Sequence, residues 1–310
     1  MTGGAGFIGS HVADRYLSEG CAVTVLDDLS SGRRDRVPRA ADFVEMGLDD
    51  PRLGEVFASG RFDTVNHHAA QADVRVSVDD PLRDARSNVT GLLNLLECVR
   101  GHGPMRVVFV SSGGVVYGEP KRIPTPEGHA KLPLSPYGVG KLAGELYLAY
   151  YAGVHGLEYA ALRYSNVYGP RQDPHGEAGV VAIFGLRILS GEPITIFGDG
   201  EQLRDYVYVG DVVEANWRAS TNPLRRTGDL DARAWNIGTG RGTSVNELAD
   251  LLMEAAGRSV ERRHAAEREG ELRVSVLDCT RAARELGWHA ETALEAGLAR
   301  TMEHLREEKR

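Results

Sequence analysis

Tyr137 and Lys141 are the residues whose types and spacing most directly indicate chemistry. They stand four positions apart in a segment that Ser135 and Pro136 open as a helix, with the serine as cap and the proline in the first turn. Side chains at that spacing lie on one helix face. A free tyrosine, with a pKa of about 10, is a poor base at neutral pH, and a nearby ammonium group favours its phenolate. The pair predicts a tyrosine base activated by lysine; an exposed helical pair without a function is the alternative.

The glycine-rich stretch at residues 2–11, TGGAGFIGSH, could bind a phosphate group. Gly4, Gly6 and Gly9 satisfy the pattern G-x-G-x-x-G, and Gly3 adds the variant G-x-x-G-x-x-G. Glycine allows a tight turn and a close backbone approach to a pyrophosphate, and the following helix directs its first N–H groups at the anion. Taken alone, the pattern is equally well explained by an ordinary glycine-rich turn.

Asp27 makes a dinucleotide the better explanation. It follows the apolar run 22–26 and lies 18 residues beyond Gly9, close to the spacing of about 20 residues for an acid that binds a ribose hydroxyl. A carboxylate there favours NAD over a cofactor with a 2′-phosphate, while Arg33 and Arg34 leave NADP as the less favoured option.

The elements that must position these residues alternate between strand and helix in the first half of the chain. Short apolar runs bounded by Gly, Pro or Asp are typical of buried parallel strands. The alternation predicts an α/β fold with a doubly wound parallel sheet and ligands at the carboxyl ends of its strands. The predicted strands are 22–26, 64–68, 106–111 and 159–163, and the predicted helices are about 9–19, 85–100 and 137–155.

After about residue 170 the pattern loosens into loops, a short strand at 194–197, and helices near 244–256 and 280–286. We therefore expect a dinucleotide-binding domain over residues 1–168 and a smaller substrate-binding domain over residues 169–310. The two are expected to be interleaved.

Composition narrows the class of protein. The chain has 310 residues, 42% hydrophobic and 26% charged, which is ordinary for a globular protein. Its net charge of −8 argues against general binding to nucleic acid or to anionic membranes. Three widely spaced cysteines suit reduced thiols of the cytoplasm, and no run is long and apolar enough to span a bilayer. His67, His68, His155 and His175 have no metal-ligand spacing; no metal is expected, and His175 could belong to a substrate loop.

Ordered motifs make the sequence resemble the extended short-chain dehydrogenase/reductase family, and within it the UDP-glucose (UDP-galactose) 4-epimerase branch. These motifs are TGGAGFIGSH, LDDLSSG, YGVGK, RYSNVYGPRQDPHGEAGVV and RDYVYVGDV, and the resemblance runs from residue 2 to the ELGW segment at 285–288. It implies a Rossmann-type fold, a cytoplasmic isomerase with NAD as cofactor and a UDP-sugar as substrate, and a homodimer through the helices near 85–100 and 137–155.

In that family a hydride passes from the sugar C4 to NAD⁺, the 4-keto intermediate rotates, and the hydride returns to the opposite face. The resemblance implies that Tyr137 removes the proton of the C4 hydroxyl and that Lys141 also bonds the nicotinamide ribose. The family's usual serine or threonine falls on Gly113 here. We expect Ser112 to replace it, because two glycines let the loop shift; otherwise Ser112 only satisfies backbone groups and Tyr137 acts alone.

Further site residues follow from the same resemblance. The family's acid near the adenine is Gly47 here, so one adenine hydrogen bond is expected to be missing. The implied cofactor contacts are Gly3, Gly6, Phe7, Ile8, Gly9, Asp27, Asp28, Leu48, Ala69, Ala70, Gln71, Asn88, Ser111, Tyr137, Lys141 and Tyr164. The implied substrate contacts are Ser112, Tyr137, Asn166, Arg204, Arg268, Glu271 and Ser275.

The substrate motif at residues 268–272, REGEL, departs from the family's R-P-G-D/E. Ser275 is four positions after Glu271, where the family places a residue against the sugar ring. Its small side chain predicts room for UDP-GlcNAc and UDP-GalNAc as well as UDP-glucose and UDP-galactose; alternatively, Ser275 simply belongs to the next strand.

Two other activities remain open. Nucleotide-sugar 4,6-dehydratases and related decarboxylases carry an acid just before V-Y-G, where this chain has Gly114 and Val115, so we favour an epimerase over a dehydratase or reductase. UDP-glucuronate would be another possible sugar substrate. A non-catalytic NAD-binding regulator is disfavoured by the intact Tyr137 and Lys141.

The start of the chain departs from the family. Its members carry a short hydrophobic strand, usually ending in valine, before the glycines, and Met1 stands where that valine would be. Because GTG encodes valine internally and also serves as a bacterial start codon, we expect that the start was assigned too late and that the first strand is truncated.

Overall fold

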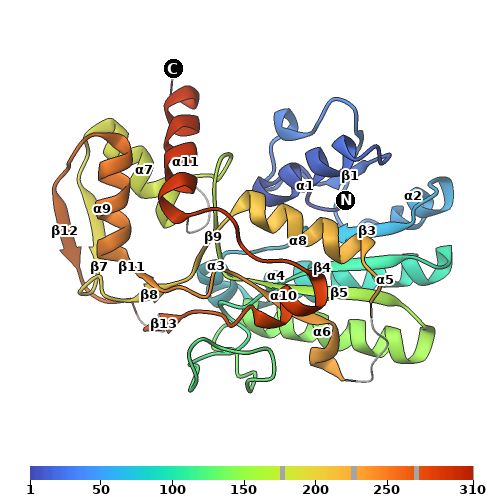
Figure 1. Ribbon diagram of the computed structural model, residues 1–310. Helices are drawn as coiled ribbons and strands as arrows, with labels where there is room; N and C mark the ends of the chain where they lie inside the picture. Colours follow the sequence, from blue (N-terminus) through green and yellow to red (C-terminus); the bar gives the residue numbers. More distant parts are fainter. Residues whose placement is uncertain (175–178, 225–228, 269–271, 310) are drawn as a thin grey trace.

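The computed structural model describes residues 1–174, 179–224, 229–268 and 272–309. Figure 1 shows two unequal lobes, a larger one built on a parallel sheet and a smaller one that carries α7 (Val180–Ser190), α9 (Val245–Ala256) and α11 (Leu294–Glu308). The predicted α/β fold with a parallel central sheet is confirmed. In the described ranges no helix is both long and apolar enough to cross a membrane.

The large sheet has the strand order of a doubly wound fold. Thr2 forms parallel bridges to both Leu26 and His67, so the first two residues lie between two strands. Every other neighbouring pair is also parallel. In order across the sheet, the strands are β2 (Asp42–Glu45), β1 (Thr24–Asp27), residues 1–2, β3 (Thr64–His67), β4 (Arg106–Ser112), β5 (Glu158–Tyr164) and β10 (Ala234–Ile237).

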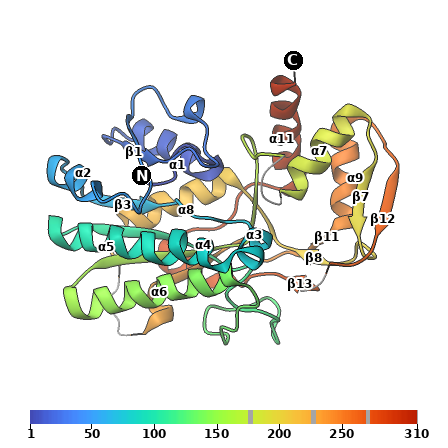
Figure 2. The same ribbon diagram turned by 180° about the vertical axis from the view of Figure 1, so that it is seen from behind.

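Both faces of this sheet are covered, because alternate side chains of each strand point to opposite faces. Val107 and Phe109 of β4 belong to one core cluster and Val108 to another. Helices α2 (Leu53–Ser59), α5 (Gly91–His102) and α6 (Pro136–His155) contribute to the first cluster, and α8 (Val209–Thr221) and α10 (Thr280–Leu286) to the second. Helix α1 (Phe7–Ser18) packs against α8. The view from behind shows α5 and α6 running side by side (Figure 2).

The helix that carries Tyr137 and Lys141 forms as its sequence predicts. Ser135 caps α6 by accepting a hydrogen bond from the Gly138 N–H, and Pro136 is in the first turn. Gly156 ends the helix with φ of 73°, a left-handed conformation that glycine adopts without strain. Three short helices precede α5: α3 (Val74–Asp79), α4 (Pro81–Ala85) and the π-helical turn η2 (Arg86–Thr90).

The smaller lobe is built from short strand pairs around its own core. Its apolar cluster joins α7, α9 and α11 to a two-stranded sheet. That sheet pairs β7 (Ile194–Phe197) with β12 (Arg262–Ala265). A second pair joins β6 (Asn166–Tyr168) to β9 (Tyr206–Tyr208). In a third sheet, β8 (Leu203–Arg204) lies between β11 (Thr243–Ser244) and β13 (Val274–Ser275). The 3₁₀ turns η1 (Arg34–Arg36) and η3 (Leu230–Arg233) complete the order.

The chain returns to the sheet lobe after residue 168. Helix α8 packs on β3, β4 and β5, and β10 extends the sheet beside β5. Elements from the second half of the chain therefore complete the first lobe. On this ground we propose that the two domains are interleaved.

Candidate active site

The glycine loop has the shape of a phosphate cradle. Gly3 has φ of 67°, and a side chain on it would place Cβ 2.5 Å from the Ala69 nitrogen. A Cβ on Gly9 would overlap the carbonyl oxygen of Gly3. Helix α1 begins after Gly6 without a side-chain cap, which leaves the N–H groups of its first turn to bind an anion. Phe7 and Ile8 lie in that turn, directly after Gly6, so the structure brings these predicted cofactor residues to the same loop.

Asp27 ties this loop to the end of β1. Its two carboxylate oxygens accept hydrogen bonds from the Ala5 and Leu29 N–H groups, each at 2.9 Å. Burial raises the pKa of Asp27, although the two N–H donors act in the opposite direction. The neighbouring Asp28 is exposed and accepts bonds from Ser30.

A second loop, after β3, is joined to the turn η2 by a pair of amide side chains. Asn88, in the π-helical turn η2, accepts a hydrogen bond from the Gln71 N–H at 3.0 Å and donates one to the Gln71 carbonyl at 2.7 Å. Both side chains also donate to Asp84 Oδ1. Gln71 and Asn88, far apart in sequence, are thus brought together, with Ala69 against Gly3. No sequence motif indicated a role for Asp84.

Lys141 is buried and lies close to Tyr137. Its Nζ is 5.7 Å from the centroid of the Tyr137 ring and 5.2 Å from that of Phe109. Burial, followed by the charge of Lys141, lowers the pKa of His68 to about 3 and that of His67 well below its ordinary value. Both imidazoles are therefore neutral at pH 7, and the lysine lies buried beside the tyrosine.

Two serine hydroxyls, from β4 and β13, lie near the position that a side chain of Gly114 would occupy. A Cβ built on Gly114 would lie 3.8 Å from Ser112 Oγ and 4.0 Å from Ser275 Oγ. A Cβ on Gly113 would lie 2.5 Å from Leu277 Cδ1, so the structure has no room for a side chain there. This close packing agrees with a glycine at the position where the family usually has a serine or threonine.

Ser111 has a different environment from Ser112. Its hydroxyl is buried and donates to Glu145 Oε1 at 2.5 Å. Tyr164 is also buried, and its hydroxyl accepts a hydrogen bond from Asn216 on α8. These two predicted cofactor residues thus direct their hydroxyl groups into the protein interior.

Three of the predicted substrate residues, Asn166, Arg204 and Ser275, lie on short strands. Arg204 in β8 pairs with Ser275 in β13, and Asn166 begins β6, with its N–H bonded to the Asp205 carbonyl. The exposed Arg268 stacks its guanidinium 3.8 Å from the Phe197 ring centroid. Glu271 and His175 lie outside the described residues.

On the cofactor side, Leu48 is buried, and its carbonyl accepts a hydrogen bond from Asn94. The preceding Gly47 has the Asp49 carboxylate beside it: a Cβ there would lie 2.7 Å from Asp49 Oδ1.

Asp205 and Ser165 were missed by the sequence analysis. Asp205 is completely buried and accepts hydrogen bonds from the N–H groups of Thr239, Gly240 and Leu277 and from the Thr239 hydroxyl. It thereby joins the segment after β10 to β8 and β13. The Ser165 hydroxyl is buried without a hydrogen-bond partner among the described residues. The only sequence signal for either is its position within the motifs RDYVYVGDV and RYSNVYGPRQ.

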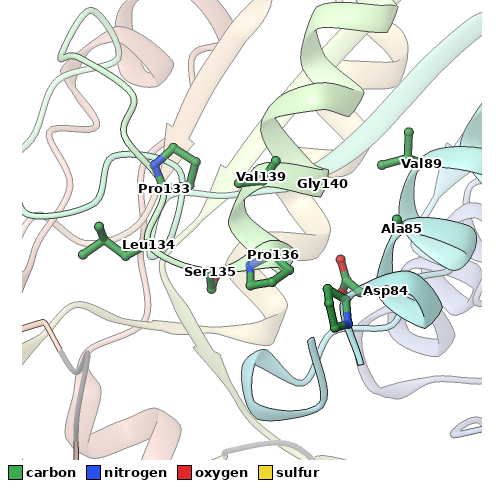
Figure 3. A pocket seen from close by; sticks show the side chains of 10 residues that line it. Asp84, Ala85, Val89, Pro133, Leu134, Ser135, Pro136, Val139 and Gly140 are labelled. Carbon is green, nitrogen blue, oxygen red and sulfur yellow. The ribbon is translucent and has the colours of Figure 1, made fainter. Parts of the chain in front are cut away.

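A pocket of about 550 Å³ lies outside this group of residues (Figure 3). It opens between the start of α6 and the α4–η2 segment, and its walls are mainly apolar. Neither Tyr137 nor Lys141 lines it, so it is not the predicted catalytic site. The residues that line it are Pro81, Asp84, Ala85, Val89, Pro133, Leu134, Ser135, Pro136, Val139 and Gly140.

Comparison with known proteins agrees with this geometry. The model of the NAD dependent epimerase/dehydratase family matches residues 1–238. A putative UDP-glucose 4-epimerase of Methanocaldococcus jannaschii is 44% identical over 310 residues, covering 100% of this chain and 99% of the relative. A UDP-glucose 4-epimerase of Mycolicibacterium smegmatis is 45% identical, covering 99% and 97%.

Solved structures give the same result. The UDP-glucose 4-epimerase of Thermotoga maritima with UDP-glucose has a TM-score of 0.95 and 48% identity, covering 100% of this chain and 98% of that one. The UDP-glucose 4-epimerase of Thermus thermophilus in complex with NAD has a TM-score of 0.92 and 43% identity, covering 98% and 97%. The chain therefore belongs to the NAD dependent epimerase/dehydratase family.

Proposed function

We propose that the protein is an NAD-dependent 4-epimerase that interconverts UDP-glucose and UDP-galactose. The observation that carries the proposal is the position of a buried Lys141 beside Tyr137, on a helix next to the strand that ends at Ser112. Full-length relatives named UDP-glucose 4-epimerase support the sugar assignment. The glycine cradle, the uncapped start of α1 and Asp27 suit the diphosphate and a ribose of NAD.

In this proposal Tyr137 removes the proton of the sugar C4 hydroxyl. The buried charge of Lys141 lowers the cost of the phenolate, because a cation in a low-dielectric site favours a neighbouring anion. Ser112 donates a hydrogen bond to the same sugar oxygen, and Arg204 binds the substrate diphosphate through its guanidinium. Bound NAD accepts the hydride from C4 and returns it.

Positions 114 and 115 disfavour a dehydratase. Elimination beyond C4 needs a further acid, and Gly114 and Val115 carry none. The atoms that a Cβ on Gly114 would approach within 4.0 Å belong to the neutral hydroxyls of Ser112 and Ser275.

Direct assay tests this function. The purified protein is incubated with NAD and separately with UDP-galactose, UDP-N-acetylgalactosamine and UDP-glucuronate, and the nucleotide sugars are separated by chromatography. We expect UDP-galactose to yield UDP-glucose without net formation of NADH. Conversion of UDP-glucuronate alone would identify a different epimerase, and a 4-keto-6-deoxy product would identify a dehydratase.

A homodimer through α6 and the α4–α5 segment is part of the proposal. Val139, Leu146, Tyr150 and Val154 are exposed on α6 at spacings of seven, four and four residues, which brings them to one helix face. That apolar face continues into the pocket of Figure 3 through Val139. Sedimentation velocity on the parent and on Leu146→Glu tests it, because a charge on the buried face of a dimer should produce monomers.

We also propose a cytoplasmic location. Cys21, Cys98 and Cys279 are free thiols in the structure, which suits a reducing compartment. Fractionation of the native cells, with the enzyme detected by antibody, tests this.

A further inference from the structure

Arg163 is a fully buried arginine whose five N–H donors are all used. Its Nε donates to Glu145 Oε1 at 2.9 Å and one Nη2 hydrogen to Glu145 Oε2 at 2.5 Å, a bidentate ion pair. The other Nη2 hydrogen reaches Asp231 Oδ1 at 2.8 Å. Nη1 donates to the Tyr117 hydroxyl at 2.9 Å and to the Glu127 carbonyl at 3.1 Å. One guanidinium in β5 therefore connects four separate segments.

The first of these segments is the catalytic helix. Glu145 is four residues after Lys141 and eight after Tyr137 on α6, so all three lie on the same side of the helix. Gly144 packs against the sheet so closely that a Cβ would lie 2.6 Å from Phe109 Cζ. The bidentate pair with Arg163 thus sets the rotation and the axial position of α6 against β5.

The second segment is the loop that follows Ser112. Its near end is held by the Gly113 N–H, which donates to the Tyr164 carbonyl at 2.8 Å. Its far end is held by Tyr117, whose hydroxyl accepts from Arg163 and donates to Asn236 Oδ1 at 2.7 Å. Ser111, next to Ser112, donates to the same Glu145 carboxylate. The helix that carries Tyr137 and the loop that follows Ser112 are thus both fixed to the hydrogen-bonded group of Arg163 and Glu145.

Stability alone does not account for this arrangement. Two ions lose much of their hydration when they are buried, and replacing a buried ion pair by apolar groups is often neutral or stabilising. A planar guanidinium, by contrast, fixes directions that an apolar contact does not.

We propose that Arg163 is a positioning residue, which aligns Tyr137 with Ser112 for reaction at one sugar oxygen by holding Glu145 and Tyr117 in a single hydrogen-bonded centre. The proposal rests on the proposed epimerase function, and it assigns Arg163 no contact with substrate or cofactor.

A matched pair of arginines makes this testable. Arg106 begins β4, at the end of that strand opposite Ser112; the fork of its Nε and Nη2 donates to a single oxygen, Glu158 Oε2, at 2.9 and 2.8 Å, and Nη1 also donates to carbonyl groups. Arg163→Lys and Arg106→Lys both keep the charge and lose the fork. A third variant, Tyr117→Phe, keeps the ion pair and removes the two hydrogen bonds of the Tyr117 hydroxyl, from Arg163 and to Asn236.

We expect Arg163→Lys to lower kcat by about tenfold or more, with KM changed less than about threefold, since bonds to charged groups are lost but no substrate contact is. Tyr117→Phe should lower kcat by about two- to tenfold. Arg106→Lys should lower the melting temperature but leave kcat within about twofold of the parent.

The parent's turnover of UDP-galactose is measured first, so that a failure of the proposed function is seen separately. A kcat loss in Arg163→Lys no greater than in Arg106→Lys, with both variants folded, would overturn the positioning role. If Arg163→Lys does not fold, Tyr117→Phe decides the question: unchanged kcat overturns the proposal, and a kcat loss at constant KM supports it.

Discussion

Arg163 in the sheet lobe and Asp205 at the smaller lobe are both 0% exposed, yet their charges are met in different ways. Arg163 faces the carboxylates of Glu145 and Asp231, and Lys131 pairs with Asp231 in turn. Asp205 accepts hydrogen bonds from three N–H groups and one hydroxyl, all neutral. Charges are balanced where α6 is held, whereas these partners of the Asp205 carboxylate, where β8 and β13 meet, are neutral dipoles.

This difference has an electrostatic consequence. Burial alone would lower the pKa of Arg163, but the bonds to Glu145 outweigh it and raise that pKa. Burial raises the pKa of Asp205, and its neutral donors offset this only in part. We therefore expect Arg163 to keep its charge at all pH values near neutral, and Asp205 to respond to acid.

The largest effect on stability is expected from Arg163→Met. The variant leaves the buried Glu145 without its cation, whereas the part-exposed Asp231 keeps Lys131, and breaking a buried pair in this way costs about 3–5 kcal/mol. Asp205→Asn, the matched change in the other centre, keeps the shape and should cost about 1–3 kcal/mol. Urea unfolding of both variants measures the two losses, and equal losses would contradict the contrast between the centres.

Ser112→Ala tests the contribution of the sheet lobe to the reaction. Loss of a donor to the reacting oxygen should slow turnover of every sugar substrate by roughly ten- to a thousandfold. Ser111→Ala is the control, because that hydroxyl donates to Glu145, and its effect should be much smaller. Steady-state kinetics of both variants measure this, and the reverse order would show that the loop does not present Ser112 to the sugar.

Ser275→Tyr tests the smaller lobe, for which we expect an effect on selectivity rather than on chemistry. The hydroxyl of Ser275 lies near Gly114, so a larger side chain should fill the space for a 2-acetamido group. The variant should lose activity on UDP-GalNAc by about tenfold or more while keeping most of its activity on UDP-galactose. Values of kcat/KM for parent and variant on both substrates test this role of Ser275. Equal losses on both substrates, or no activity of the parent on UDP-GalNAc, would contradict it.

The smallest effect is expected from the titration of Asp205. Because its folded-state pKa is raised above the unfolded value of 3.8, the folded protein binds more protons between the two values, and its stability falls as the pH rises through that window. Asp205→Asn lacks this contribution. The stability difference between parent and variant should therefore shrink with rising pH in the acid range, and a difference independent of pH would show that Asp205 does not titrate there.

The parts of the fold that were predicted have local signals. The strand at 194–197 and the helix at 280–286 have the bounds that the sequence indicates, and four sheet strands were found within two residues at each end. Helix α8 and strand β10 were not predicted. Both return to the sheet lobe from far along the chain, and their packing there is decided by tertiary contacts rather than by a local pattern.

The same distinction holds for the site. The glycine loop, Asp27 and the Tyr137–Lys141 pair are recognisable because their chemistry needs a fixed local spacing. The hydrogen bonds of Arg163 reach residues that are 18 to 68 positions away, and those of Asp205 reach residues 34 to 72 positions away. No sequence spacing indicates such partners, so these two centres became visible only in the folded structure.

Tyr137→Phe tests the central claim most directly, namely that Tyr137 is the base of an NAD-dependent epimerase. The turnover of UDP-galactose and the NAD content are measured on the same samples of parent and variant. We predict that the variant keeps its NAD, because the ring and its packing remain, while turnover falls by about 10²- to 10⁴-fold. A variant that retains more than about a tenth of the parent's turnover would contradict the assignment of Tyr137 as the base.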